Sequence, residues 1–362
     1  MKDTFRRNNF DLIRVLAALQ VALHHAAYHF EVPGTWWEAT QLLPGVPTFF
    51  FVSGFLISKS FENSPQLLDY ARNRALRIFP ALFACTALAL ASVWLSGYFA
   101  TVSVPTRTFV AWVVGQLTVV QFFNPDFMRG FGSGVLNGSL WTITVELQFY
   151  VLVPILYAAL RRLAASRRAE TVCLLVLVAA FLVANQVFLK MNETRSEQFV
   201  MKLVKVTFAP WFYMFLVGVL VQRNFETVHR ALANRALVVV PAFLVAGWAG
   251  SRLFGWDVGN QIHPALFLAL AAAVFSAAYT LPDLAERLLR RNDISYGLYI
   301  YHIPVINLMM YRGHMHETRD VAIAVATSVA LAAASWFVLE RPAIRLKRRS
   351  IHAPAAAAGA AP

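Results

Sequence analysis

The chain has 362 residues, of which 58% are hydrophobic and only 14% are charged. Soluble domains are usually about 45–50% apolar and about 25% charged, so this composition excludes an ordinary soluble protein and indicates an integral membrane protein. The net charge of +13 does not require nucleic acid as a partner, because the basic residues cluster between apolar stretches, as in a topology signal.

The first apolar stretch, residues 10–30, carries one aspartate, one arginine and three histidines. At about 100° per residue, Arg14 and His25 share one helix face to within roughly 20°, and Asp11 lies close to that face. Ionisable groups inside a membrane span indicate a functional site. The alternative is an ion pair between Asp11 and Arg14 at the membrane surface. Because His24 points roughly 100° away, we expect His25 and not His24 to face the site.

Eleven apolar stretches can be drawn, at 9–30, 44–60, 78–98, 108–123, 139–160, 171–189, 203–221, 236–253, 262–280, 293–311 and 319–340. Both ends of the chain are basic, which places both in the cytoplasm and requires an even number of spans. We therefore expect the short stretch 108–123 not to cross. The remaining spans put 22 Lys and Arg residues on the cytoplasmic side and nine outside. The sequence predicts an all-α polytopic membrane protein, a bundle of about ten transmembrane helices with both termini cytoplasmic.

Two segments are expected to lie outside this bundle pattern. Residues 99–139 form a long outer segment that is re-entrant or interfacial, since non-helical backbone at membrane depth occurs only where protein buries it or where it lines a cavity. Residues 346–362 are basic and Ala-rich and predict a disordered cytoplasmic tail. The only two cysteines, Cys85 and Cys173, lie in apolar runs. They provide neither a disulfide framework nor metal-ligand spacing, so we expect no metal.

Three arginines, Arg72, Arg74 and Arg77, precede the third span in what reads as a cytoplasmic loop. Guanidinium groups bind phosphate through paired hydrogen bonds and keep their charge. The cluster therefore suits a phosphorylated ligand that arrives from the cytoplasm. The alternative is ordinary anchoring to anionic lipid.

Polar residues also interrupt three later spans. Glu146 lies about two turns into its span, and is either one half of a structural ion pair or a carboxylate that orients a histidine or accepts a substrate hydroxyl. Ser53 and Gly54 predict close helix packing. His302 lies among Tyr residues, and we interpret it as a pocket wall rather than as a proton-handling group.

Six segments, taken in order, resemble the acyltransferase-3 family of bacterial membrane acyltransferases, which O-acylate cell-surface sugars, Nod factors and some antibiotics. The segments are FDLIRVLAALQVALHHA, GVPTFFFVSGFLIS, RNRALRIFP, LWTITVELQFYVLVP, ISYGLYIYHIPV and WFVLERPAIR. The resemblance covers roughly residues 9–345, which implies an acyltransferase-3-type transmembrane domain at 1–345 followed by the tail at 346–362.

The resemblance assigns individual residues. The family's Arg-x10-His spacing is met by Arg14 and His25. Its Arg-x-Arg element corresponds to Arg72 and Arg74, and its membrane-embedded glutamate to Glu146. The usual Trp-Ser-Leu before that glutamate reads Trp-Thr-Ile here, so the hydroxyl is retained.

The implied function is a membrane-embedded O-acyltransferase of the bacterial cytoplasmic (inner) membrane. Acyl-CoA, expected to be acetyl-CoA, is the donor, and a hydroxyl of a sugar or glycolipid is the acceptor; the oligomeric state is not indicated. The expected catalytic residues are His25, Arg14, Asp11 and Glu146, and the expected donor-binding residues are Arg72, Arg74 and Arg77. His25 would act as general base or as transient acyl carrier.

In this arrangement Arg14 lies near the cytoplasm, His25 lies roughly 16 Å further out, and the acceptor approaches from outside near Glu146. A different class of function remains open, namely a proton-coupled carrier or exporter that uses Arg14, His25 and Glu146. The absence of a detectable internal repeat, and of Gly- or Pro-broken helices in matching positions, argues against a carrier.

Overall fold

The structure, a computed structural model, describes residues 5 and 7–347. Across these residues every regular element is a helix and no strand occurs. Of the expected tail at 346–362, only Leu346 and Lys347 are described; the rest lies outside the described residues.

The long helices are α2 (Phe10–His29), α3 (Gly45–Asn63), α4 (Leu67–Leu95), α5 (Thr106–Leu117), α6 (Trp141–Leu163), α7 (Arg167–Arg195), α9 (Phe212–Arg223), α11 (Ala236–Phe254), α12 (Pro264–Ala278), α14 (Ser295–Tyr311) and α15 (Thr318–Ser335). The short ones are η1 (Glu38–Leu42), η2 (Tyr98–Ala100), η3 (Asp126–Met128), η4 (Gly138–Leu140), α8 (Phe199–Lys205), α10 (Phe225–Leu232), η5 (Gly259–Gln261), α13 (Leu284–Leu289), the π-helix η6 (Trp336–Glu340) and α16 (Arg341–Arg345).

Within the described residues, seven helical segments are long and apolar enough to cross a membrane. They are Phe10–His29, Glu38–Asn63, Leu67–Leu95, Gly138–Leu163, Arg167–Arg195, Ala236–Phe254 and Thr318–Arg345. The prediction of an all-α polytopic membrane protein is confirmed at this level. Three further apolar helices, α9, α12 and α14, have 12, 15 and 17 residues, fewer than the ~20 that cross a bilayer without local thinning.

The segment around the expected non-crossing stretch 108–123 is built differently from a span. Its helix, α5, has only 12 residues, and the irregular chain that follows packs against α14. There the Asn137 side chain donates to the Ile300 carbonyl at 2.7 Å, and the Asn307 side-chain oxygen accepts from the Ser133 backbone at 2.9 Å. Gly132, at φ +52°, lies so close that a Cβ would stand 2.6 Å from the Asn307 backbone. Protein therefore buries this backbone and satisfies its polar groups, as non-helical chain at membrane depth requires.

The third span begins earlier than predicted, and this corrects the expected arginine loop. Helix α4 starts at Leu67, so Arg72, Arg74 and Arg77 all lie on its first turns. At about 100° per residue, Arg74 and Arg77 lie within roughly 60° of each other and Arg72 lies on the opposite side. The three guanidinium groups therefore cannot act as one cluster.

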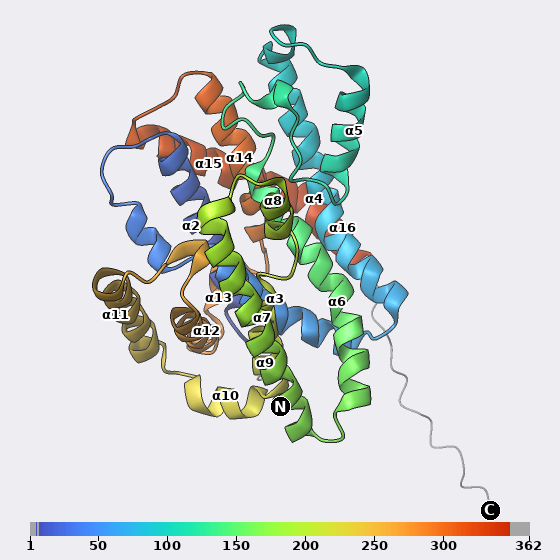
Figure 1. The fold of residues 1–362 in the computed structure, drawn as a ribbon, viewed down its shortest axis with the longest axis vertical. Helices are drawn as coiled ribbons and strands as arrows, with labels where there is room; N and C mark the ends of the chain where they lie inside the picture. Colours follow the sequence, from blue (N-terminus) through green and yellow to red (C-terminus); the bar gives the residue numbers. More distant parts are fainter. Residues whose placement is uncertain (1–4, 6, 348–362) are drawn as a thin grey trace, which may run out of the picture.

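Close helix contacts hold the centre of the bundle together. Helices α3 and α9 touch at Gly54 and Gly218, where a Cβ would lie 2.0 Å from the Phe215 carbonyl oxygen and 2.2 Å from the Phe51 carbonyl oxygen, respectively. The sequence-based interpretation of Gly54 as a packing position is confirmed. Helix α14 packs against α2, α4 and α15 (Figure 1). This packing brings the last third of the chain against the first helix.

Candidate functional site

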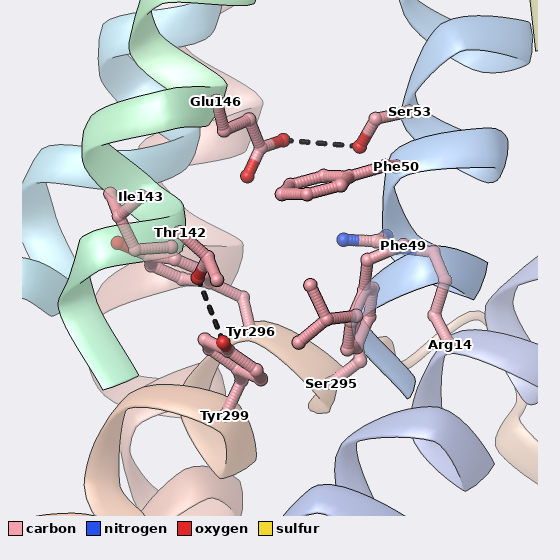
Figure 2. A pocket seen from close by; sticks show the side chains of 11 residues that line it. Arg14, Phe49, Phe50, Ser53, Thr142, Ile143, Glu146, Ser295, Tyr296 and Tyr299 are labelled. Atoms are coloured by element: carbon pink, nitrogen blue, oxygen red, sulfur yellow. Dashed lines mark hydrogen bonds between the residues drawn. The ribbon is translucent and has the colours of Figure 1, made fainter. Parts of the chain in front are cut away.

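Two cavities lie along α2, one toward each end. The first, which we name the Arg14 cavity, encloses about 430 Å³, and its polar lining is Arg14, Ser53, Thr142, Glu146, Ser295 and the hydroxyl-bearing Tyr296 and Tyr299 (Figure 2). The second, the His25 cavity, encloses about 410 Å³ and is lined by Gln20, His24, His25, Gln41, Gly259 and Asn260. Val46 lines both cavities. The two expected centres on α2 thus face separate spaces that meet at one side chain.

Arg14 is held by Asp293, and not by Asp11 as in the alternative of an ion pair at the membrane surface. The buried Asp293 carboxylate pairs with both Arg14 and Arg77 and also accepts from the Ser295 hydroxyl. Asp11 is exposed and forms no ion pair with Arg14. The reason is positional: Asp293 lies just before the first turn of α14, where it reaches one guanidinium from α2 and one from α4.

Glu146 lies in the Arg14 cavity and not beside a histidine. Its carboxylate accepts from the Tyr150 hydroxyl at 2.7 Å and from the Ser53 hydroxyl at 3.3 Å; Figure 2 shows the second of these bonds. Glu146 is thus separated from the histidine pair, and its position at the outer, acceptor side stays a prediction. Helix α6 begins at Trp141 only after the buried irregular segment, so its first turns already lie deep in the protein.

Arg74 on α4 lies beside a residue that contacts the lining of the Arg14 cavity. Its guanidinium lies 5.7 Å from the ring centre of Tyr150, the residue that also binds Glu146. It donates to the Ser60 hydroxyl at 3.2 Å, while its Nε atom is buried without a partner. Arg72 is exposed and is found in no hydrogen bond or ion pair among the described residues.

Lys347 extends this basic region beyond the last span. The residue is half-buried. Burial, together with the positive charges of Arg74, Arg77 and Arg14, lowers the pKa of Lys347 to about 7. Burial is the larger cause, and the neighbouring positive charges add to it. An anion bound here would offset the repulsion among these charges.

His25 is hydrogen-bonded to another histidine. Its Nδ1 atom lies 2.8 Å from Nε2 of His302, which is buried on α14, and the two rings stack at 5.1 Å between centres. One of the two nitrogens must donate and the other accept, so the pair shares a proton and cannot carry two at this contact. His302 is therefore more than the pocket wall expected from sequence. The sequence contains one indication of such a role, because His302 is a polar residue at the centre of an apolar helix.

His24 faces the same cavity as His25, contrary to expectation. The two imidazoles lie on adjacent residues, yet Nε2 of His24 reaches the Gln41 side-chain nitrogen at 3.0 Å, and both rings line the His25 cavity. His24 and His25 differ in direction by about 100° around the axis of α2, as predicted. The cavity is wide enough to reach both side chains because residues of η1 and η5 form its opposite wall.

Within the described residues, no group of three or more His, Cys, Asp or Glu side chains is arranged to hold a metal ion. The polar side chains instead form two separate groups, one in each cavity. One contains a guanidinium, Arg14, and a carboxylate, Glu146, and the other consists of imidazoles and amides.

Comparison with known proteins matches residues 7–340 to a family described as an acyltransferase domain. The chain is 33% identical over 356 residues to nodulation protein 10 of Rhizobium leguminosarum bv. viciae, with 94% of each chain covered. It is 25% identical over 345 residues to an O-acetyl transferase of Shigella phage Sf6, covering 93% of this chain and 96% of the relative. It is 24% identical over 341 residues to acyltransferase MdmB of Streptomyces mycarofaciens, covering 84% and 81%. No solved structure matches significantly.

Proposed function

The chain belongs to the acyltransferase-3 family, and on that premise we propose that it moves an acyl group, expected to be acetyl, from acyl-CoA to a hydroxyl of a sugar or glycolipid. Membership makes the protein an acyltransferase, which sets aside the carrier alternative. The donor and the acceptor are our proposal. The observation that carries it is the position of His25 in a cavity without charged side chains, next to a separate cavity lined by Arg14.

We propose that ten helices cross the bacterial cytoplasmic membrane, with both termini in the cytoplasm. The shorter α9, α12 and α14 would cross in addition to the seven long segments, and α5 would not. The excess of basic residues, 22 against nine, supports this orientation. A cysteine introduced at Ser166 should be shielded from a membrane-impermeant reagent in intact cells. Its labelling from outside would refute the orientation.

The donor's phosphates are best matched by the basic region around Arg74, Arg77 and Lys347. Arg74 has an unpartnered buried Nε, and Lys347 sits among like charges. Both features disfavour the empty site and favour a bound polyanion. From this region the acyl arm would follow α2 past Arg14 toward His25, over roughly 16 Å.

His25 is the proposed reacting histidine, and His302 is its positioning residue. As a base, His25 takes the proton of the acceptor hydroxyl while that oxygen attacks the thioester carbon, and the C–S bond breaks to release CoA thiolate, which then takes up the proton. As an acyl carrier, His25 attacks the thioester carbon first, and the C–S bond breaks to release CoA thiolate. The acceptor hydroxyl then attacks the acyl-imidazole, the ester forms as the C–N bond to His25 breaks, and the hydroxyl proton goes to the thiolate. Asp11 and Glu146, which were also expected to be catalytic, form no hydrogen bond with His25 among the described residues, so we propose no direct step for them.

The test is to incubate membranes that contain the protein with radiolabelled acetyl-CoA and a glycan extract from the host. We expect label in an alkali-labile ester, and loss of that ester from surface glycans or small metabolites of a deletion strain, detected by mass spectrometry. Membranes carrying His25→Gln are the control. Absence of acyl-CoA turnover with correctly inserted protein, over all extracts, would refute the proposed function.

A further inference from the structure

One side chain lies between the Arg14 cavity and the His25 cavity. Among the described residues, Val46 on α3 is the one that lines both, and it is only 4% exposed. The face of α2 that runs from Arg14 to His25 is covered as well, since the residues between them on this face are buried, namely Ala18, Val21 and Ala22. Packed protein therefore divides the two cavities, and at Val46 the division is one side chain thick.

The start of α3 packs directly on α2 between the cavities, which fixes the position of Val46. At Gly45, the first residue of α3, a Cβ would stand 2.5 Å from the Ala17 carbonyl oxygen and 2.6 Å from the Val21 side chain. The Gly45 backbone N–H also donates to the Gln20 side-chain oxygen at 2.8 Å. Glycine is needed here because no side chain fits at this separation of the two helices. The next residue, Val46, therefore has little freedom to move away from α2.

Val46 is itself a stiff residue in a stiff stretch of chain. Prolines flank it at positions 44 and 47, and each proline ring fixes its own φ at about −65°. Valine branches at Cβ, which restricts the rotation of its side chain about χ1. A long unbranched side chain such as that of methionine adapts its shape to a neighbour. A valine held in this way instead forms a barrier of nearly constant size.

The proposed reaction requires an acyl group to pass this barrier. The donor's phosphates are assigned to the basic region around Arg74, whereas the imidazole of His25 lies in the other cavity. The thioester carbon must come within bonding distance of the acceptor oxygen or of His25, so the acyl chain attached to it has to pass Val46. At a close-packed apolar contact, one extra methylene changes a rate by about 10–200-fold. Such a barrier therefore distinguishes acyl chains that differ by one or two carbons.

We propose that Val46 selects the acyl group, because it admits an acetyl group to His25 and obstructs longer straight chains. The inference rests on the proposed function and adds a residue that determines acyl-chain length. Val46 forms no bond with either substrate and exchanges no proton, so it acts through its volume alone. The bonds made and broken are those of the transfer described above. Donor affinity, which depends on the phosphates, is independent of the size of residue 46.

The first experiment compares acyl donors of increasing length. Purified protein in lipid nanodiscs receives acetyl-, propionyl-, butyryl- or hexanoyl-CoA together with the host glycan extract, and ester formation is followed by mass spectrometry. The unsubstituted protein should use acetyl-CoA best. Val46→Ala should raise kcat/KM for butyryl-CoA relative to acetyl-CoA by about tenfold or more, the effect of making room for one methylene.

Val52→Ala is the matched control for this comparison. Val52 is also a valine of α3, is 1% exposed and lines neither cavity. Its truncation removes the same two methyl groups from the protein interior, and the ratio of butyryl-CoA to acetyl-CoA use should not change. Equal ratios for Val46→Ala and Val52→Ala would overturn the proposal. So would an unsubstituted protein that uses hexanoyl-CoA as fast as acetyl-CoA.

The second experiment narrows the passage. Val46→Phe should form no ester from acetyl-CoA while it still binds radiolabelled acetyl-CoA in nanodiscs, and that binding shows that the variant is folded. Transfer of acetyl by Val46→Phe at the unsubstituted rate would contradict a barrier at this position. Val46→Ala, a change to a smaller residue, keeps the test decisive if Val46→Phe does not insert. If the unsubstituted protein consumes none of the four donors, the proposed function fails, and this inference fails with it.

Discussion

Nδ1 of His25 and Nε2 of His302 lie 2.8 Å apart across the contact between α2 and α14. This contact engages one nitrogen of His25 and leaves Nε2 as the nitrogen available for chemistry. No carboxylate contacts His25 among the described residues, so His302 occupies the place that a carboxylate or backbone carbonyl often takes beside a working histidine. Two helices from opposite ends of the chain therefore determine the orientation of the reacting imidazole.

We expect His302→Leu to lower kcat for acyl transfer by about ten- to a hundredfold, because a buried imidazole nitrogen left without its partner costs ~1–3 kcal/mol. His302→Gln should restore part of the rate, since its amide can still form the hydrogen bond. Initial rates at saturating donor and acceptor, normalised to inserted protein, provide the measurement. Equal rates for Leu and Gln would argue that His302 only fills space.

Asp293→Asn should lower the thermal stability of the protein in detergent. The Asp293 carboxylate pairs with both Arg14 and Arg77, and Arg77 also lies 3.9 Å from Glu340. Removing one partner of a buried ion pair costs about 3–5 kcal/mol. The matched control is Asp283→Asn, which removes an exposed pair with Arg7 and should barely change the melting temperature. Equal shifts for the two variants would contradict a structural role for the buried network.

Arg74→Ala should weaken use of acyl-CoA by ~1.5–3 kcal/mol, the range for hydrogen bonds to charged groups, and Arg74→Lys should rescue it only in part because lysine lacks the planar fork. Arg72→Ala should be mild, since that side chain is exposed on the other side of α4. The KM for acetyl-CoA in membranes distinguishes them. A larger effect at Arg72 than at Arg74 would place the phosphates elsewhere.

Lys347 predicts a pH dependence of donor binding. Its pKa of about 7 means that its charged form is lost as pH rises through that value, so affinity for a polyanion should fall between about pH 6 and 8. Lys347→Arg keeps the charge throughout this range and should flatten the profile without loss of affinity at low pH. A wild-type profile of donor KM that is already flat would exclude Lys347 from the donor site.

The helices could be predicted from hydrophobicity because long apolar runs are local. Arg14, His25 and their separation along one helix follow from spacing alone, and the structure places both in cavities. The partners could not be predicted in this way. Asp293 and His302 lie 279 and 277 positions from the residues that they bind, and one sequence contains no record of such contacts.

One local prediction was wrong for a physical reason of its own. The arginine segment looked like a loop because it is charged, but helix α4 continues through it, since arginine is a good helix former.

The central claim is that His25 carries out the transfer, and the most direct measurement compares His25→Gln with His24→Gln at matched protein levels. Both side chains line the same cavity, and glutamine conserves volume and polarity but cannot titrate. With labelled acetyl-CoA and acceptor both saturating, we expect His25→Gln to form no ester while it still binds acetyl-CoA. His24→Gln should keep most of its kcat. Ester formation by His25→Gln at a rate near that of the unsubstituted protein, or its loss in His24→Gln alone, would contradict the account.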